Sequence, residues 1–95
     1  MNRIHVTHRA RSDIREIWNY IAADNRGAAD ALLKAFYEKF ELLQATPEVG
    51  CERKDLEGGL RSFPVGRYII FYLLPEETIK IVRVLHGARD IDTLL

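Results

Sequence analysis

The chain has 95 residues, of which 47% are hydrophobic and 29% are charged. This length gives room for one domain, residues 1–95, with a single modest core, and the composition excludes an intrinsically disordered chain. Fourteen Lys and Arg balance fourteen Asp and Glu. The zero net charge argues against a protein that holds nucleic acid by bulk charge alone, although it leaves room for a local basic face.

Cysteine content and hydropathy favour the cytoplasm. Cys51 is the only cysteine, so no internal disulfide can form, and we interpret it as a loop or half-buried thiol without an activating neighbour. The longest apolar run, residues 68–74, is far shorter than the roughly 20 residues of a membrane helix. The start of the chain lacks the apolar segment of a signal peptide. We therefore expect a cytoplasmic protein without membrane contact.

The first half of the sequence predicts a short strand and a helix. Ile4 and Val6 alternate with polar residues, which is typical of a strand with one buried face. A helix is expected from about His8 to Asp24, with charged residues on its outer sides, Asp13 among them. Its apolar stripe repeats at helical spacing and consists of Ile14, Ile17, Trp18 and Ile21.

A second helix is expected to form a hairpin with the first. Asn25 can cap its start by accepting a hydrogen bond from a free backbone N–H, and Pro47 ends it because proline disfavours helical geometry in the preceding residue. The apolar residues between these two positions again share one face, and they are Ala29, Leu32, Leu33, Phe36, Phe40 and Leu43.

The second half of the sequence predicts a sheet. A polar, glycine-containing loop is expected from Glu48 to Gly59. Three segments rich in β-formers follow, separated by short turns that join antiparallel neighbours: Leu60–Val65, Arg67–Leu74 and Ile79–His86. The predicted class is α+β in the order βααβββ, an N-terminal helical hairpin packed on an antiparallel sheet. A short helix is one option for the tail, Ala88–Leu95.

The segment Tyr68–Tyr72 is apolar on both faces, so it is expected to be a central strand with material packed over each side. The helical hairpin would cover one face of the sheet. The sequence leaves open what covers the other face, and a segment of a partner protein is one candidate.

Arg83 lies within an apolar strand, on the face predicted for Ile81 and Leu85. A guanidinium there must be paired or must face a cleft, because a lone buried charge is too costly. One interpretation is a salt bridge to a carboxylate such as Asp90 or Glu52. The other is an arginine that binds an anion.

Arginines near Arg83 suggest a cationic surface at one end of the sheet. Five groups from three segments are candidate target-binding residues that could converge there: Arg61, Arg67, Arg83, His86 and Arg89. Such a cluster would suit phosphate, whereas the alternative is scattered edge-strand arginines kept for solubility. His86 could transfer protons at neutral pH, or it could cap a turn.

The sequence indicates no cofactor and no metal. His5 and His8 lack an acidic or cysteine companion at metal-ligand spacing, and no glycine-rich phosphate loop or nucleophile elbow occurs. Most aromatic residues fall at core positions. Tyr20 and Tyr37 lie off the apolar stripes, so they are candidate contacts for a partner, or else surface residues.

Four segments together resemble the ParE/RelE superfamily of toxins, in family order and over nearly the full chain: residues 10–21, 47–50, 60–72 and 81–90. The resemblance implies the βααβββ fold and the toxin role in a type II toxin–antitoxin module, neutralised by a cognate antitoxin in a hetero-oligomer. ParE-like members are associated with DNA gyrase, whereas RelE-like members cleave mRNA in the ribosome. A shared fold does not choose between these targets.

The residues favour the ParE-like branch. A RelE-like nuclease would need cations on the phosphate with an acid and a base, and Arg61, Arg67 and Arg83 with Glu52 or His86 could supply these. However, Gly87 and Ala88 stand where the nuclease pattern has a terminal aromatic or His-Tyr pair, and the usual lysine-rich segment is reduced to Arg53-Lys54. The leading hypothesis is therefore a gyrase inhibitor that acts by binding, with no catalytic residue assigned. The alternatives are a ribosome-dependent mRNA endonuclease and a non-toxic binding module.

Overall fold

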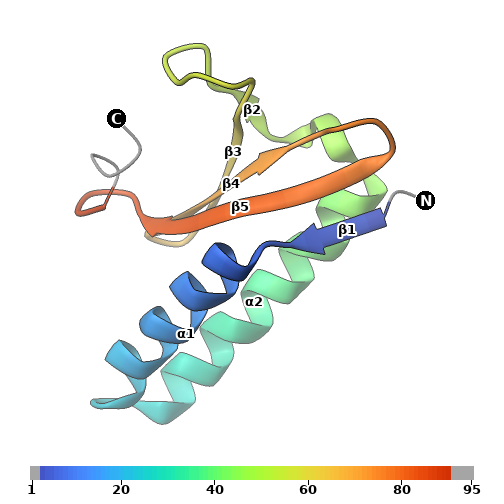
Figure 1. Cartoon of the computed structure of the whole chain (residues 1–95). Helices are drawn as coiled ribbons and strands as arrows, with labels where there is room; N and C mark the ends of the chain where they lie inside the picture. The colour runs from blue at the N-terminus through green and yellow to red at the C-terminus, as the bar shows by residue number, and fades with distance from the viewer. Residues whose placement is uncertain (1–2, 91–95) are drawn as a thin grey trace.

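The computed structural model describes residues 3–90, which form a helical hairpin on one face of a five-stranded sheet (Figure 1). In chain order the elements are β1 (Arg3–Val6), α1 (His8–Ala22), α2 (Arg26–Ala45), the short 3-10 helix η1 (Pro47–Val49), β2 (Cys51–Glu52), β3 (Arg61–Val65), β4 (Tyr68–Leu73) and β5 (Thr78–His86). The predicted α+β class and βααβββ order are confirmed, with β2 as a short addition inside the expected loop. Of the tail, residues 88–90 form a turn, and the remainder of the expected helix lies outside the described residues.

The sheet is mostly antiparallel, as predicted, with one parallel pair that the prediction did not include. Its strand order is β1-β5-β4-β3-β2, and β3, β4 and β5 are antiparallel neighbours, as expected. β1, however, runs parallel to β5, with Arg3 opposite Thr78 and Val6 opposite Ile81. A parallel pair needs a long connection, and here the connection is all of the chain between β1 and β5.

Side-chain caps set where both helices begin. Thr7 Oγ1 accepts a hydrogen bond from Ala10 N at 3.1 Å, and Asn25 Oδ1 accepts one from Ala28 N at 3.0 Å. The capping role predicted for Asn25 is therefore confirmed. Helix α1 ends at Ala22, slightly before the predicted Asp24, because the N–H groups of residues 24 and 25 both bond to the carbonyl of Ile21 in a tight turn.

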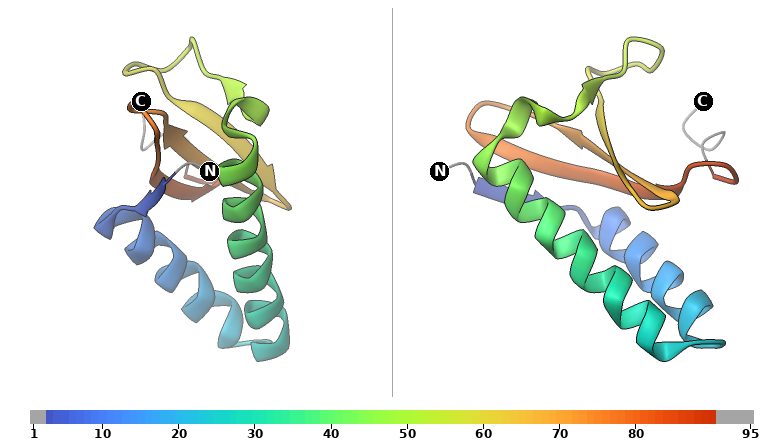
Figure 2. Two further views of the ribbon diagram at one scale, coloured as in Figure 1. Left: turned by 90° about the vertical axis from the view of Figure 1, so that its right-hand side faces the viewer. Right: turned by 180° about the vertical axis from the view of Figure 1, so that it is seen from behind.

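The main core lies between the helical hairpin and the sheet. Helix residues Ile14, Phe36, Phe40 and Leu43 pack there against buried strand residues of β4 and β5. The tip of the hairpin, where α1 meets α2, projects beyond the sheet (Figures 1 and 2). This leaves the outer surface of both helices accessible.

The chain itself covers the second face of the sheet. Leu56, from the loop between β2 and β3, packs with Phe71 and Leu85 in a smaller buried cluster, and Leu60 and Ile69 adjoin it. Figure 2 shows this loop on the side of the sheet away from the helices. No partner segment is needed to explain why β4 is apolar on both faces.

A β-bulge changes which residues of β5 face the helices. Tyr72 is opposite Ile81, but the preceding Phe71 is opposite Arg83, so Val82 is the extra residue. The extra residue reverses the alternation, and Ile81 therefore lies in the main core whereas Leu85 lies in the second cluster. The prediction that Arg83 shares a face with both Ile81 and Leu85 was wrong for Ile81.

Candidate functional site

The free edge of β5 is completed by α1. β1 pairs with β5 only as far as Ile81. Beyond that residue the edge is met by Thr7, whose N–H bonds to Ile81 O at 3.1 Å and whose hydroxyl donates to Val82 O at 3.2 Å. Next along the edge, Val84 N donates to Asp13 Oδ2 at 3.0 Å. A side chain of α1 thus takes the hydrogen bond that a neighbouring strand would otherwise provide.

The same carboxylate holds Arg83. Arg83 Nε donates to Asp13 Oδ2 at 2.8 Å, and Arg83 Nη2 donates to Asp13 Oδ1 at 3.1 Å. The side chain of Arg83 is 15% exposed and that of Asp13 is 8% exposed. The hydrogen bonds that Arg83 donates to Asp13 raise the pKa of Arg83 above its ordinary value against the opposing effect of burial, and the charges of Asp13, Asp90 and Glu16 add to the rise. A salt bridge was one predicted role of Arg83, but the expected partners, Asp90 and Glu52, were wrong.

Asp13 is the site residue that sequence reasoning missed. The predicted pattern placed it among the charged residues on the outer sides of the first helix, yet it is only 7% exposed. A signal was present, because Asp13 is three residues after Ala10 and one before Ile14, both of which are buried. A carboxylate on a buried stripe needs a donor nearby.

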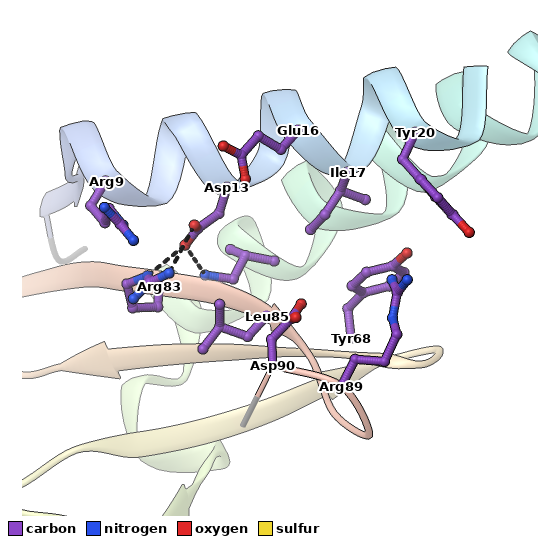
Figure 3. Close-up of a pocket in the computed structure, with 11 residues that line it drawn as sticks. Arg9, Asp13, Glu16, Ile17, Tyr20, Tyr68, Arg83, Leu85, Arg89 and Asp90 are labelled. Carbon is purple, nitrogen blue, oxygen red and sulfur yellow. Dashed lines mark hydrogen bonds and ion pairs between the residues drawn. The ribbon is translucent and has the colours of Figure 1, made fainter. Parts of the chain in front are cut away.

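An open pocket of about 400 Å³ lies between α1 and the end of β5 (Figure 3). It contains both charge signs, since Arg83 and Arg89 line it together with Glu16 and Asp90. Figure 3 shows Arg89 extending from the turn after β5 toward Tyr20 of α1, and its Cζ is 5.3 Å from the centre of the Tyr20 ring. This geometry is a cation–π contact.

A second pocket of about 450 Å³, which we name the β5-end pocket, also includes Tyr20 and Arg89. Apolar side chains and cations line it, and the residues are Tyr20, Ile21, Leu32, Arg67, Tyr68, His86 and Arg89. Its parts are held in place by the sheet. Gly87 N bonds to Arg67 O at 2.9 Å, and the His86 ring meets the Tyr68 ring edge-on with 5.3 Å between centres.

His86 organises the turn that carries Arg89. Its ring Nδ1 accepts hydrogen bonds from Ala88 N and Arg89 N, each at 3.2 Å. The backbone N–H of His86 donates to Asp90 Oδ2 at 3.1 Å. The predicted capping role is therefore seen. Because Nδ1 is an acceptor, a neutral His86 carries its proton on Nε2, which leaves that N–H as a donor.

Arg61 does not join the other predicted cations, so the convergence of all five was wrong. It is opposite Tyr72 on β4, whereas His86 is opposite Tyr68. Four residues along a strand correspond to roughly 13 Å. Arg61 begins β3 and Arg67 follows it, so the two arginines lie toward opposite ends of the same strand.

Arg61 instead clamps the turn before β2. Its Nη2 donates to Glu48 O at 2.9 Å and to Gly50 O at 2.8 Å, and its Nη1 pairs with Glu52 at 3.2 Å. Burial alone would lower the pKa of Arg61, but its interactions with Tyr72 and Glu52 outweigh this effect and raise it. Nearby Cys51 is exposed in β2.

The two candidate partner-contact tyrosines belong to different surfaces. Tyr37 of α2 is 53% exposed and stacks edge-on against Phe40, with 5.6 Å between ring centres. It borders a groove of about 290 Å³ between the helices, which we name the hairpin groove, lined by Arg11, Ile14, Arg15, Trp18, Leu33 and Tyr37. Tyr20 is 68% exposed and lies in the β5-end pocket.

Among residues 3–90, no cluster of three or more His, Cys, Asp or Glu side chains could hold a metal ion. Neither α1 nor α2 is both long and apolar enough to span a bilayer.

Comparison with known proteins gives one family. Residues 4–91 match the family described as "ParE toxin of type II toxin-antitoxin system, parDE". "Toxin ParE3" of Caulobacter vibrioides is 30% identical over 92 residues, which cover 96% of this chain and 92% of that protein. "Toxin ParE1" of Mycobacterium tuberculosis is 30% identical over 86 residues, 87% of each chain.

A solved structure shows the same fold. It is described as "Chromosomal ParDE TA system from P. aeruginosa", and it superposes with a TM-score of 0.77 at 19% identity over 90% of this chain and 96% of its own. The family match extends over nearly the whole described range and includes the Asp13–Arg83 pair and the β5-end pocket. The chain belongs to the ParE toxin family of type II toxin–antitoxin systems.

Proposed function

We propose that this ParE toxin inhibits DNA gyrase by binding, and that a cognate antitoxin neutralises it in the cytoplasm. One observation carries the choice of binding over catalysis. Of the four groups that a nuclease would use, Arg67 and His86 share the β5-end pocket, but its lining contains no Asp or Glu, and Arg61 and Arg83 are bound elsewhere to the chain's own atoms. Arg61 binds the turn before β2, Arg83 binds Asp13, and His86 Nδ1 accepts two backbone N–H groups.

A supercoiling assay tests the target. Relaxed plasmid, purified gyrase and ATP are incubated with increasing toxin, and we expect supercoiling to fall as toxin reaches a molar excess over gyrase. The matched control adds the toxin together with its antitoxin and should restore activity. Normal supercoiling at a large excess of folded toxin would contradict gyrase as the target.

The nuclease alternative makes the opposite prediction in a ribosome assay. Programmed ribosomes mixed with this toxin should leave the mRNA intact, because the pocket that contains Arg67 and His86 has no Asp or Glu to complete an acid–base pair. Cleavage of the mRNA would favour the endonuclease. Harmless expression of the chain without antitoxin would instead favour a non-toxic binding module.

We propose the hairpin groove as the antitoxin's contact surface. Its apolar residues, Ile14 and Leu33, lie beside Trp18 and the exposed Tyr37, while Arg11 and Arg15 supply positive charge. An amphipathic helix with an apolar face and flanking acidic residues complements this combination. The projecting hairpin offers such a helix an unobstructed approach (Figure 1).

Tyrosine substitutions test this assignment. Tyr37→Ala should raise the Kd for the antitoxin about tenfold or more, because exposed interface tyrosines are frequent hot spots, without changing the circular dichroism spectrum. Tyr20→Ala is the matched comparison, since Tyr20 is also an exposed tyrosine but lies outside the groove. If both variants bind the antitoxin as tightly as the wild type, the hairpin groove is not the contact.

A further inference from the structure

The β5-end pocket has a charge pattern that the neighbouring surfaces lack. Arg67, His86 and Arg89 line it, and its lining contains no Asp or Glu. The adjoining pocket, by contrast, includes Asp13, Glu16 and Asp90. Among residues 3–90 neither Arg67 nor Arg89 forms a salt bridge. In a chain of zero net charge this pocket is therefore a local cationic site.

The backbone that carries the donors of this pocket is held by hydrogen bonds. Arg67 follows β3 in a turn, and its carbonyl accepts a hydrogen bond from Gly87 N at 2.9 Å. Arg89 sits on the turn capped by His86 Nδ1, and its guanidinium rests 5.3 Å from the Tyr20 ring centre. His86 keeps an Nε2 donor because its Nδ1 is occupied. Holding the backbone of these residues in advance lowers the cost of binding an anion.

We propose that the β5-end pocket binds a phosphodiester group of DNA. Two guanidinium groups and an imidazole N–H can together donate to both non-bridging oxygens of a phosphodiester and offset its single negative charge. The exposed ring of Tyr20 at the same rim offers a flat surface for the adjoining sugar. This inference rests on the proposed gyrase function, since gyrase works on DNA, and it adds that the toxin contacts the DNA as well as the enzyme.

Direct binding to DNA tests the site without gyrase. The probe is a fluorescein-labelled duplex of about 20 base pairs at low salt, followed by anisotropy. The double variant Arg67→Gln/Arg89→Gln should bind at least tenfold more weakly than the wild type. The slope of log K against log salt should shrink by about 2, since each lost phosphate contact contributes about 0.9. The control Lys34→Gln/Lys80→Gln removes the same charge from exposed positions on α2 and at the far end of β5 and should change the affinity less than threefold.

The following binding results would overturn the proposal. The first is an absence of binding by the wild type at low salt, and the second is an equal loss in both double variants, which would indicate bulk charge. The third is a loss of antitoxin affinity in Arg67→Gln/Arg89→Gln with DNA binding unchanged, which would identify an acidic peptide as the ligand. A single-stranded RNA probe of equal length should bind no more tightly than the duplex, and clearly tighter binding would contradict DNA.

The gyrase proposal can fail separately. If wild-type toxin binds DNA through these arginines but leaves supercoiling unaffected, the phosphate site stands and gyrase inhibition falls. Suppose instead that the toxin inhibits gyrase and that Arg67→Gln/Arg89→Gln inhibits equally well without binding DNA. The DNA contact then plays no part in gyrase inhibition, and the inference that the toxin acts on DNA as well as on the enzyme is overturned. Weaker inhibition by this variant, with the Lys34/Lys80 control unchanged, is the expected result.

Discussion

Gly50 occupies a position with no room for a side chain. Its N–H donates to the hydroxyl of the fully buried Tyr72 at 2.9 Å, and the same hydroxyl donates to Pro47 O at 2.8 Å. The carbonyl of Gly50 accepts a hydrogen bond from Arg61. The φ of Gly50 is −73°, which any residue can adopt, so glycine is required here for space and not for conformation. A Cβ atom would lie 2.8 Å from Ser62 O and still closer to the Tyr72 ring.

Gly50→Ala should therefore destabilise the fold by about 2 kcal/mol, because the added methyl displaces a buried hydrogen-bonded phenol. Urea unfolding followed by circular dichroism measures the change. Gly27→Ala is the matched control. Its nearest neighbour would be Asn25 Oδ1 at 3.5 Å, and alanine in the first turn of α2 should be neutral or stabilising by up to ~1 kcal/mol. Equal effects from the two substitutions would contradict the steric explanation.

At the scale of elements, α1 serves as a substitute strand for the C-terminal half of β5. Asp13 accepts from Val84 N and from two nitrogens of Arg83, so one carboxylate joins the helix to the sheet edge. This junction also fixes where α1 lies relative to the turn that carries Arg89. The two pockets at this end of the molecule depend on it, because both are lined by α1 on one side and β5 on the other.

Asp13→Ala should cost about 3 kcal/mol of folding free energy, because it leaves a mostly buried guanidinium without its carboxylate and a strand N–H without an acceptor. Asp13→Asn keeps one acceptor oxygen, so its folding free energy should lie between those of Asp13→Ala and the wild type. Glu16→Ala, an exposed acidic residue on the same helix, should change stability by less than about 0.5 kcal/mol. Chemical denaturation of the three variants measures these changes in folding free energy. A loss in Asp13→Ala as small as that in Glu16→Ala would contradict the role given to the Asp13–Arg83 pair.

At the scale of the whole molecule, the chain closes both faces of its own sheet. The helices bury one face, and the loop between β2 and β3 places Leu56 over Phe71 and Leu85 on the other. Within the loop Arg53 makes a bidentate contact with Asp55, at 2.9 and 2.7 Å, and the guanidinium of Arg53 lies 5.8 Å from the Phe71 ring centre on the sheet. The helical hairpin projects from this closed unit, which fits the molecule's unequal dimensions of 39 × 30 × 21 Å (Figure 2).

This arrangement predicts that the toxin folds cooperatively without its antitoxin and that Leu56 contributes to its stability. Leu56→Ala should destabilise the isolated chain by about 2 kcal/mol, because truncating a buried leucine leaves a cavity. Leu42→Ala, at a leucine that is 36% exposed on α2, should cost well under half as much. Thermal and urea unfolding provide the measurement. No difference between the two leucines would indicate that the loop does not seal the second face.

The sequence by itself determined the elements and their order, because the alternation of strands, the apolar stripes of helices and the cap at Asn25 are local properties. The buried strand at Tyr68–Tyr72 followed from its apolar character on both faces. The cationic end of the sheet followed in part, since Arg67, His86 and Arg89 are close to the ends of neighbouring strands. The family resemblance carried the toxin assignment that the comparisons confirmed.

Only the tertiary structure decided the register and the partners. The bulge at Val82 separates Ile81 from Leu85, and no periodicity reveals one inserted residue whose position depends on the facing strand. The pairing of Arg83 with Asp13 joins residues 70 positions apart, and it needs the helix to lie along a free sheet edge. Likewise, only the structure shows that Arg61 binds the carbonyls of the turn before β2. Hydrogen-bonding partners distant in the chain are set by three-dimensional packing, which a local pattern does not encode.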